Sequence, residues 1–600
     1  MPTVTVDKQN LFEALEKNYT PEELFELCFR FGIELEEDTT EALLKGGAAA
    51  EGLSQRPQLK FDIPANRYDL LCQEGIQRAL RVFMGKQKPP VYKLVKPADG
   101  KLHQIIVKPE TAQIRPAIVG AILRNITFTQ ERYDSFIDLQ DKLHNNICRK
   151  RTLASMGTHD LDTIQGPFTY KALPHKDIKF VPLNKDIEMD GDQLMEHYTN
   201  DRNLGKFLHI IRDSPVYPVV YDANRVVCSL PPIINSEHSK IKLTTKNVFI
   251  EITATDEHKA STALNTLVTM FSEYCSEPFT VEPVEIVYPG NTVKVTPNIA
   301  PRRAAANVDY INSCTGLELA GNEICELLGK MTLDAKVNPD NKGEVLVDVP
   351  PTRWDILHAC DIMEDVAISY GYDNLPKKMP GVNTVGSTFP INKLSDHARR
   401  ELAMAGFTEV ATLTLCSHDE NFKFLNRVDD MKTAVKLANP KTIEYQVVRT
   451  SLLPGVLKTI NSNKKLPLPI KVFEVSDVSF KDETRERRTR NERHVLAAYA
   501  SKTSGFEVIH GLLNRMMEML HTSLISKSSS ELGYWIQESE NATYFPGRSA
   551  DIYLRYFDSE ASARKEVVIG SFGVLHPTVL SSYELSHPIT ALEFNLEPFL

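Results

Sequence analysis

The sequence lacks three features that would place the chain in a specialised class of protein. Apolar runs such as 216-VYPVVY-221 are far shorter than the roughly 20 residues that a membrane helix needs. The nine cysteines stand singly, without a CxxC pair, which argues against a disulfide framework and against a structural zinc site. The formal net charge of −10 lacks the basic excess of a protein that binds nucleic acid mainly by its own charge. We therefore expect reduced, mostly buried thiols, and any nucleic-acid contact should be local or shared with a more basic partner.

Several enzyme signatures are missing as well. The sequence has no GxxxxGK[ST], no GxGxxG after a strand and no GxSxG, so phosphate-loop enzymes, Rossmann dehydrogenases and α/β-hydrolases are poorly supported. The opening residues MPTVTVDKQNLFEAL show neither the charged and apolar regions of a signal peptide nor the composition of a transit peptide. We expect a cytoplasmic protein without a membrane segment.

What the sequence does contain is the composition of an ordinary globular protein. It has 600 residues, of which 42% are hydrophobic and 25% are charged. Since domains usually span roughly 100–200 residues, we expect about four folded units. Helical and strand patterns alternate along the whole chain, which predicts an α+β multidomain fold.

Periodicity and capping residues predict several elements. Thr20 is placed as the N-cap of a helix that ends at Gly32. Further helices are expected at 9–18, 130–151 and 257–275. Surface loops are indicated by the small and polar residues of two segments, 45–58 and 376–390, and the second has the composition of an interdomain linker.

A ten-residue motif occurs twice. The pattern D-[IV]-P-x-x-R-[YW]-D-[IL]-L runs from 62 to 71 and again from 348 to 357, each time between a predicted strand and a predicted helix. When the following helices are aligned with one gap, Glu364 and Asp365 fall opposite Gln77 and Arg78. The shared part is thus interpreted as a structural frame, and the acidic residues as an addition to the second copy.

The second copy carries four carboxylates within eleven residues: Asp355, Asp361, Glu364 and Asp365. The last three are spaced i, i+3, i+4, so they share one helix face with roughly 5–6 Å between Cβ atoms, and Asp355 could cap the helix or converge on that face. One interpretation is a solvated acidic face, because exposed like-charge pairs cost only about 0.2–0.5 kcal/mol. The other is a basic partner or a Mg²⁺ ion, which prefers oxygen ligands.

A second group of polar residues surrounds a Pro-Pro bend. Strand 247–256 alternates with period two, so Glu251 points away from the face that carries Val248. Ser229, Asn235 and Glu251 could converge in one pocket that binds a small polar group or positions a water molecule. The alternative is that the residues after the bend form an ordinary loop.

Two further groups of polar residues are interpreted as structural and not as binding sites. The set His159, Asp160 and Asp162 lies in 156-MGTHDLDT-163, a composition more typical of a turn than of a metal site. The basic residues between Arg485 and Arg493 alternate with Asp and Glu, which favours a solvated hairpin.

Taken together, many stretches in one order resemble a known family. They include 1-MPTV-4, 62-DIPANRYDLLC-72, 113-QIRPAIVGAILRNI-126, 156-MGTHDLD-162, 231-PPIINSEHSKI-241, 355-DILHACDIMEDVAISYGY-372, 439-NPKTIEYQVVRTSLLPGVL-457, 544-YFPGR-548 and 573-GVLHP-577. Over essentially its whole length the chain resembles cytosolic phenylalanyl-tRNA synthetase beta subunits of the archaeal and eukaryotic type, with high similarity to fungal members. The resemblance implies an alpha₂beta₂ heterotetramer that attaches phenylalanine to tRNA(Phe) with ATP and Mg²⁺, and an aminoacylation site on the alpha subunit.

The resemblance also implies a domain order. It comprises an N-terminal α/β structural module (1–112), an editing domain of the B3/B4 type (113–285), a B5-type, winged-helix or putative-DNA-binding-like module with the acidic helix (298–376), and a class II synthetase-like antiparallel sheet domain (385–600). The last domain is expected to be catalytically inactive. Arg449 is followed by Ser451 where a working ATP site carries glutamate, and residues 591–600 contain no arginine.

Two sets of site residues follow from the resemblance. Asp355, Asp361, Glu364 and Asp365 map to Mg²⁺ ligands near the alpha subunit. Ser229, Asn235 and Glu251 map to the editing domain, which hydrolyses mischarged tyrosyl-tRNA, with Glu251 holding the tyrosine hydroxyl. The alternative is a noncatalytic scaffold that only positions tRNA and the alpha subunits.

Overall fold

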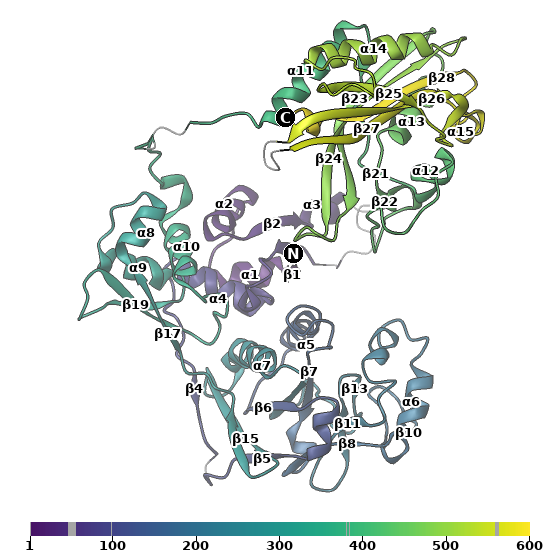
Figure 1. Ribbon diagram of the computed structural model, residues 1–600. Coiled ribbons are helices and arrows are strands. Elements are labelled where there is room, and N and C mark those ends of the chain that lie inside the picture. The colour runs from purple at the N-terminus through teal and green to yellow at the C-terminus, as the bar shows by residue number, and fades with distance from the viewer. Residues whose placement is uncertain are drawn as a thin grey trace. The chain divides into compact units, whose positions relative to one another are not determined.

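The computed structural model describes residues 2–45, 54, 56–97, 99–379, 381–382, 385–558 and 563–600. The chain forms two compact units, Met1–Pro380 and Gly381–Leu600 (Figure 1). The boundary between the units falls inside the predicted linker 376–390. Within the described residues, no helix combines the length and the apolar character that crossing a membrane requires. Six of the nine cysteines are buried and all nine are free thiols, as expected.

The first unit begins with a small three-stranded antiparallel sheet in the order β1-β3-β2. Its elements are β1 (Thr3–Asp7), α1 (Lys8–Ala14), α2 (Pro21–Phe31), β2 (Glu34–Asp38), α3 (Thr40–Lys45), β3 (Gln58–Asp62), η2 (Tyr68–Leu70) and α4 (Gln73–Phe83). Thr20 forms the predicted cap, because its side chain accepts from the backbone of Glu23, and Gly32 ends α2 with φ of 90°. Helix α1 ends earlier than expected, since the chain turns into a left-handed conformation at Glu16. Most of the predicted loop 45–58 lies outside the described residues.

The middle of the first unit is built around an eleven-stranded sheet. Its main path runs β13-β12-β11-β8-β5-β15-β6-β14-β7, and β4 and β16 pair with β15. The strands are β4 (Lys93–Leu94), β5 (His103–Val107), β6 (Ala117–Leu123), β7 (Ala154–Asp160), β8 (Phe168–Leu173), β11 (Tyr217–Tyr221), β12 (Val227–Leu230), β13 (Ile234–Asn235), β14 (Val248–Ala254), β15 (Thr280–Tyr288) and β16 (Thr292–Thr296).

Two long helices of this region, α5 (Gln130–Asn145) and α7 (Glu257–Phe271), lie next to β6 and β7 (Figure 1). They pack on the side chains of Val248 and its period-two neighbours, which belong to the core shared with the N-terminal module. Phe249 belongs to a different core cluster, so the alternation predicted for this strand is confirmed. The predicted end of the helix at 130–151 is wrong, because α5 ends at Asn145 and a tight turn follows.

The first unit closes with a second small module, whose strand order β17-β19-β18 repeats the order β1-β3-β2. Its elements are β17 (Arg302–Asn307), α8 (Val308–Thr315), α9 (Gly321–Lys330), β18 (Asp334–Val337), β19 (Glu344–Val349) and α10 (Ala359–Tyr370). Both modules place two helices after the first strand and one helix after the third. The ten-residue motif is therefore the visible part of a repeat that includes the whole module.

The second unit is organised around a seven-stranded sheet in the order β20-β23-β24-β28-β27-β26-β25. Its strands are β20 (Thr408–Glu409), β23 (Ile470–Lys481), β24 (Thr489–Ala500), β25 (Gly533–Glu538), β26 (Tyr544–Asp558), β27 (Ala563–Leu575) and β28 (Ile589–Asn595). All pairs along this order are antiparallel except β20 with β23. The expected hairpin of basic and acidic residues joins β23 to β24, and its arginines 485, 487 and 488 are exposed.

Helices cover both faces of this sheet. One core cluster contains α11 (Pro390–Met404) and α14 (Phe506–Met519), and the other contains α13 (Leu453–Ser462). Neighbouring residues of β24 alternate between the clusters, since Ala497 belongs to the first and Leu496 to the second. The sheet is therefore buried on both faces.

Candidate active site

A cavity of about 760 Å³ opens in the middle region of the first unit. Its walls come from helix α5, from strands β7, β12, β13 and β14, and from the segments 183–185 and 198–204. Ser229, Asn235 and Glu251 all line this cavity, so the structure brings together the three residues that were predicted to converge. Its volume lies in the range of small-molecule binding sites.

The three side chains are tied together by strand pairing and hydrogen bonds. Ser229 on β12 lies opposite Asn235 on β13. The Ser229 hydroxyl donates to Glu251 Oε1 at 2.7 Å, and Asn235 Nδ2 donates to the carbonyl of Thr158 at 3.3 Å. Ser229 and Glu251 are each only 1% exposed. A buried carboxylate is thus held beside a hydroxyl at the inner wall of the cavity.

Gly157 makes room for the Glu251 carboxylate. Glu251 lies opposite Gly120 on β6 and opposite Gly157 on β7. A Cβ atom at position 157 would stand only 2.2 Å from Glu251 Oε1. The carboxylate therefore occupies the space that any side chain at position 157 would need.

One oxygen of Glu251 has no hydrogen-bond partner among the residues that the structure describes. Glu251 Oε2 is buried without a hydrogen bond, and so is Nε2 of the neighbouring His159. The other ring nitrogen of His159 contacts the Ser239 hydroxyl at 2.8 Å, and Nε2 lies 3.8 Å from Glu251 Oε1. Because an unpaired buried polar atom is costly, these two atoms are suited to accept or donate hydrogen bonds to a bound ligand.

The structural interpretation of His159 as part of a turn is wrong. His159 lies inside strand β7, fully buried beside Glu251. A period-two interpretation of 156-MGTHD-160 would have placed Gly157 and His159 on one face of a strand. Asp160 follows the turn interpretation better, since it caps the short helix after β7.

The side of the cavity near the end of α5 carries charges of both signs, since Asp141 lines it together with Arg151. His144 accepts a hydrogen bond from the backbone N–H of Met156 at 2.8 Å. Burial, together with the nearby cations of Arg151 and Arg115, holds the pKa of His144 well below its usual range. The imidazole is therefore neutral, and the two arginines supply the positive charge here.

The four carboxylates of the second motif do not gather around one point. The buried guanidinium of Arg353 donates to Asp355 from Nε at 3.0 Å and from Nη2 at 2.7 Å, and Nη2 also donates to Asp365 at 2.7 Å. Burial acts to raise the pKa of Asp355, but Arg353 lowers it below its usual value. Burial outweighs the same arginine at Asp365 and raises its pKa to about 6. Arg353 contacts both carboxylates directly, and the cation of Arg67 also acts on them.

The other two carboxylates have different surroundings. Asp361 Oδ2 accepts from the backbone N–H groups of Leu357 and His358 at 2.7 Å each, so Asp361 rather than Asp355 caps α10. Glu364 is exposed. Across the described residues, no group of three or more His, Cys, Asp or Glu side chains is placed to hold a metal ion. The four carboxylates therefore do not fit a single four-ligand Mg²⁺ site within this chain.

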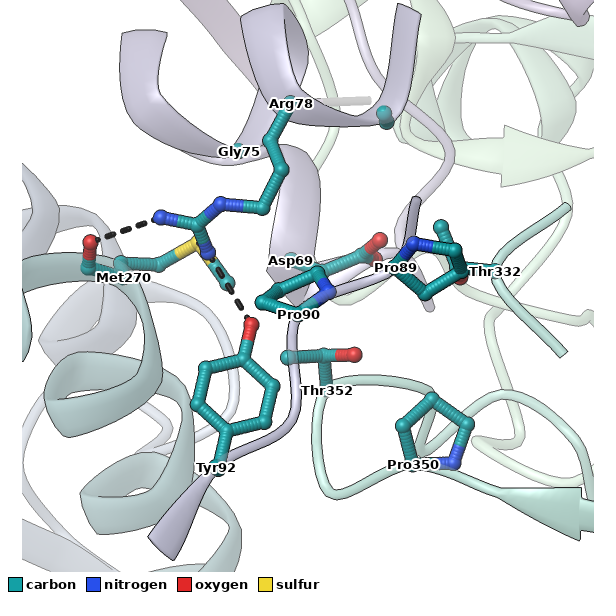
Figure 2. Close-up of a pocket in the computed structure, with 11 residues that line it drawn as sticks. Asp69, Gly75, Arg78, Pro89, Pro90, Tyr92, Met270, Thr332, Pro350 and Thr352 are labelled. Carbon is teal, nitrogen blue, oxygen red and sulfur yellow. Dashed lines mark hydrogen bonds between the residues drawn. The ribbon is translucent and has the colours of Figure 1, made fainter. Parts of the chain in front are cut away.

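The first copy of the motif repeats the arginine–aspartate pair but uses its helix differently. Arg67 donates to both oxygens of Asp69, at 2.9 and 2.8 Å. Arg78, opposite Asp365 in the alignment, reaches toward α7 instead and donates to the carbonyl of Met270 and to the Tyr92 hydroxyl, both at 3.1 Å (Figure 2). The cavity beside it is small, with about 30 Å³ of space, and its lining comes from both small modules and α7, so we interpret it as a joint between modules.

In the second unit, the motif arginine is engaged by the protein itself. Arg449 is buried and donates to Glu474 at 2.9 Å and to the Thr412 hydroxyl at 2.8 Å. Ser451 donates to Glu593. Both side chains at the expected ATP-binding positions therefore have partners within the sheet domain.

Comparison with known proteins assigns a family to each part of the chain. Four family models match: the Phe-tRNA synthetase beta subunit B1 domain at 1–86, the B3/4 domain at 103–278, the tRNA synthetase B5 domain at 304–372 and the phenylalanyl tRNA synthetase beta chain CLM domain at 375–596. The cavity lies within the B3/4 match and the acidic helix within the B5 match.

Full-length relatives and a solved structure agree with these matches. The chain is 52% identical to the phenylalanine–tRNA ligase beta subunit of Saccharomyces cerevisiae over 610 residues, 52% identical to that of Drosophila melanogaster over 605 and 48% identical to that of Homo sapiens over 604, with 100% of each chain covered. A crystal structure of an N-terminal fragment of the phenylalanyl-tRNA synthetase beta subunit from Pyrococcus horikoshii matches with a TM-score of 0.54 and 31% identity, covering 62% of this chain and 99% of that one. The chain therefore belongs to the family of phenylalanine–tRNA ligase beta subunits.

Proposed function

We propose that this chain is the beta subunit of a phenylalanine–tRNA ligase, which with an alpha subunit forms an alpha₂beta₂ enzyme that attaches phenylalanine to tRNA(Phe) using ATP. Its full-length similarity to beta subunits from fungi and animals supports this assignment. Aminoacylation takes place on the alpha subunit. The second unit is a class II synthetase-like domain without activity, because Arg449 is held by Glu474 and is not available to bind phosphates.

We further propose that the cavity lined by Ser229, Asn235 and Glu251 hydrolyses tyrosine from mischarged tRNA(Phe). The observation that carries this proposal is the orphaned, buried Glu251 Oε2 at the cavity wall. The phenol O–H of tyrosine donates to this oxygen and satisfies it, whereas the phenyl ring of phenylalanine leaves Oε2 buried without a hydrogen bond. A site built around a polar partner rejects the analogue that lacks the matching group, so correctly charged tRNA is spared.

The remaining side chains hold the substrate for attack by water. Ser229 fixes Glu251 in one orientation through its hydrogen bond, and Asn235 presents an amide near the backbone of β7. Water attacks the ester carbonyl carbon, the bond to the ribose oxygen breaks, and that oxygen leaves with a proton. Tyrosine and intact tRNA(Phe) are released.

Enzymes of this family depend on Mg²⁺, and the chain offers at most part of a site for it. Asp355 and Asp365 are bound to Arg353, which leaves Asp361 and Glu364. One or two carboxylates with several waters is an arrangement that Mg²⁺ accepts. We propose that any ion at the acidic helix is held by these two residues together with water or the alpha subunit.

The test uses the complex of this chain with its alpha subunit. We expect the wild-type complex to deacylate tyrosyl-tRNA(Phe). Glu251→Ala should lower the deacylation rate at least about tenfold, since one hydrogen bond to a charged group supplies about 1.5–3 kcal/mol. Charging with phenylalanine should continue in this variant. Glu196→Ala, at an exposed glutamate of the same region, serves as the matched control. If the wild-type complex charges tRNA but does not deacylate tyrosyl-tRNA(Phe), the noncatalytic scaffold is the correct function of this domain.

A further inference from the structure

Arg151 places a positive charge at the wall of the cavity without an ion-pair partner. Its Nη1 donates to the carbonyls of Pro232 and Ile233, at 3.3 and 3.0 Å, and its Nε–H is buried without an acceptor in the described part of the chain. Within the described residues, no carboxylate lies within 4.0 Å of its guanidinium, and Asp141 acts on it only at longer range. The guanidinium is therefore held in place without a direct ion pair, and the carboxylate of Asp141 lines the same cavity.

The backbone that carries Arg151 adopts an unusual conformation. Arg149, Lys150 and Arg151 have φ angles of 45°, 53° and 66°, three consecutive residues in the left-handed region that side chains other than glycine rarely adopt. Such conformations persist only where the surroundings determine them, and they concentrate at functional sites. The turn ends α5 and directs the third side chain, Arg151, to the cavity.

A second arginine fixes this turn from behind. Arg115 is 1% exposed and donates to the carbonyls of Arg151 and Thr152, at 3.2 and 3.3 Å. It also donates to the backbone and hydroxyl oxygens of Thr253, the residue two positions after Glu251 on β14. All four of these acceptors are uncharged, so Arg115 adds to the positive charge behind the cavity wall and links the turn to the strand that carries Glu251.

The substrate of the proposed hydrolysis has one group that matches this charge. At its end, tyrosine is esterified to the terminal adenosine of tRNA; the phenol and the ester are neutral and the amino group is cationic. The phosphodiester on the 5′ side of that adenosine is the nearest anion, and a guanidinium suits phosphate oxygens through its fixed fork of donors. Lys240, which also lines the cavity, is already bound to Glu237 and Asn184.

We propose that Arg151 binds the phosphate of the terminal nucleotide and so positions the ester in the cavity while the tyrosine phenol reaches Glu251. This inference rests on the proposed hydrolysis. The cavity is larger than an amino-acid side chain requires, which leaves room for the adenosine between the two groups. Arg151 acts in binding and orientation, and Glu251 selects the amino acid.

The experiment compares two substrates in the assembled enzyme. One is tyrosyl-tRNA(Phe); the other is tyrosine esterified to adenosine, which lacks the phosphate. For Arg151→Gln we expect the KM for tyrosyl-tRNA(Phe) to rise about tenfold, the size of a lost hydrogen bond to a charged group, with kcat within about twofold of wild type. The adenosine ester should be hydrolysed by the variant as by the wild type.

Salt dependence and a neighbouring variant complete the design. Loss of one phosphate contact should reduce the slope of log KM against log salt by about 0.7, and Arg151→Lys should keep most of that slope because it keeps the charge. Arg149→Gln removes an exposed arginine from the same turn and should leave both substrates unchanged.

Three outcomes would contradict the proposal or its basis in distinguishable ways. An equal loss on both substrates would mean that Arg151 only supports the Pro232–Ile233 loop. An unchanged KM and salt slope would mean that it does not touch phosphate. If the wild-type enzyme hydrolyses neither substrate, the proposed hydrolysis itself is wrong and Arg151 is not the cause.

Discussion

At the scale of single residues, the candidate active site depends on a glycine, because its lack of a side chain leaves space for a neighbour. Gly157 leaves the space that the carboxylate of Glu251 fills, and a Cβ there would also lie 2.8 Å from His159 Nε2. Neither backbone conformation nor turn chemistry demands this glycine, since β7 is regular strand. Its role is to let a carboxylate lie flat against the neighbouring strand.

Gly157→Ala should therefore abolish deacylation of tyrosyl-tRNA(Phe) without preventing charging. The added methyl group must displace Glu251 or push the strands apart, at a cost of about 1–3 kcal/mol in the free energy of unfolding. Deacylation and charging rates of the assembled enzyme, with a denaturant titration, measure both effects. Gly329→Ala, where nothing lies within 4 Å of the new atom, is the control and should change neither rate. A Gly157→Ala enzyme that still deacylates at the wild-type rate would remove Glu251 from the mechanism.

Arg353 gives a second prediction at this scale. It is 1% exposed and compensates Asp355 and Asp365, so Arg353→Met leaves two buried carboxylates without their nearest cation. We expect a loss of about 3–5 kcal/mol in the free energy of unfolding of the first unit, measured by denaturant titration. The control is Arg303→Met, which breaks an exposed pair with Asp348 and should cost no more than about 1 kcal/mol. Similar losses in the two variants would show that the pairs of Arg353 are no more important than a surface contact.

At the scale of elements, the sequence predicts local features well and tertiary ones poorly. The cap of α2 at Thr20 and the alternation of β14 depend on neighbouring residues, and both are confirmed. The predicted end of α5 is wrong because a left-handed turn follows the helix. This turn is stabilised by Arg115, which lies about thirty positions earlier in the chain. Spacing on α10 predicts a shared acidic face. In the structure, however, Arg353 from the preceding turn donates a hydrogen bond to Asp365, which is buried.

The pairing of β24 with β28 creates a pH-sensitive contact. His494 on β24 contacts Glu593 on β28 at 2.9 Å and Glu492 on its own strand at 3.4 Å. Burial acts to lower the pKa of His494, but hydrogen bonds to Glu492 and Glu593 raise it to about 9. Because the folded pKa lies above the unfolded value, the charged histidine stabilises the sheet fully below about pH 6.5, and this stabilisation is lost as the pH rises toward 9.

The second unit should therefore become less stable as the pH rises through this window, by on the order of 3 kcal/mol. Chemical denaturation of wild type and His494→Gln across the window measures the effect, and the variant should show a flatter profile. His587→Gln replaces an exposed histidine of the same unit and should retain the wild-type slope. A wild-type profile that is flat above pH 6.5 would mean that His494 is neutral in the folded sheet.

At the scale of the whole molecule, composition and motifs predict the general organisation and leave the cavity undefined. The linker composition at 376–390 predicts the boundary between the units, and the repeated motif indicates a duplicated module. The cavity could be only partly anticipated. Strand pairing across the sheet brings Glu251 to Gly157, and Arg151 reaches the cavity through a turn that no local pattern encodes. Sequence thus identified Ser229, Asn235 and Glu251 as candidates, but not the residues that make space and charge around them.

The division of the cores implies that the first unit folds by itself. Four hydrophobic clusters lie entirely within residues 1–380 and two entirely within residues 381–600. No apolar residue of one unit completes a described cluster of the other, and a fragment with its own buried core can fold alone. The crystallised N-terminal fragment of the Pyrococcus horikoshii relative has a similar extent.

A fragment of residues 1–380 should accordingly unfold in one cooperative transition, within a few degrees of a transition seen in the intact chain. Calorimetry of the fragment, of residues 381–600 and of the full chain tests this, and the full chain should show two transitions that match the fragments, because each unit keeps all of its own core. Gly157→Ala should then shift only the transition of the first fragment, and His494→Gln only that of the second. A single transition in the full chain, together with a fragment 1–380 that lacks a cooperative transition, would mean that the second unit is required to complete the first.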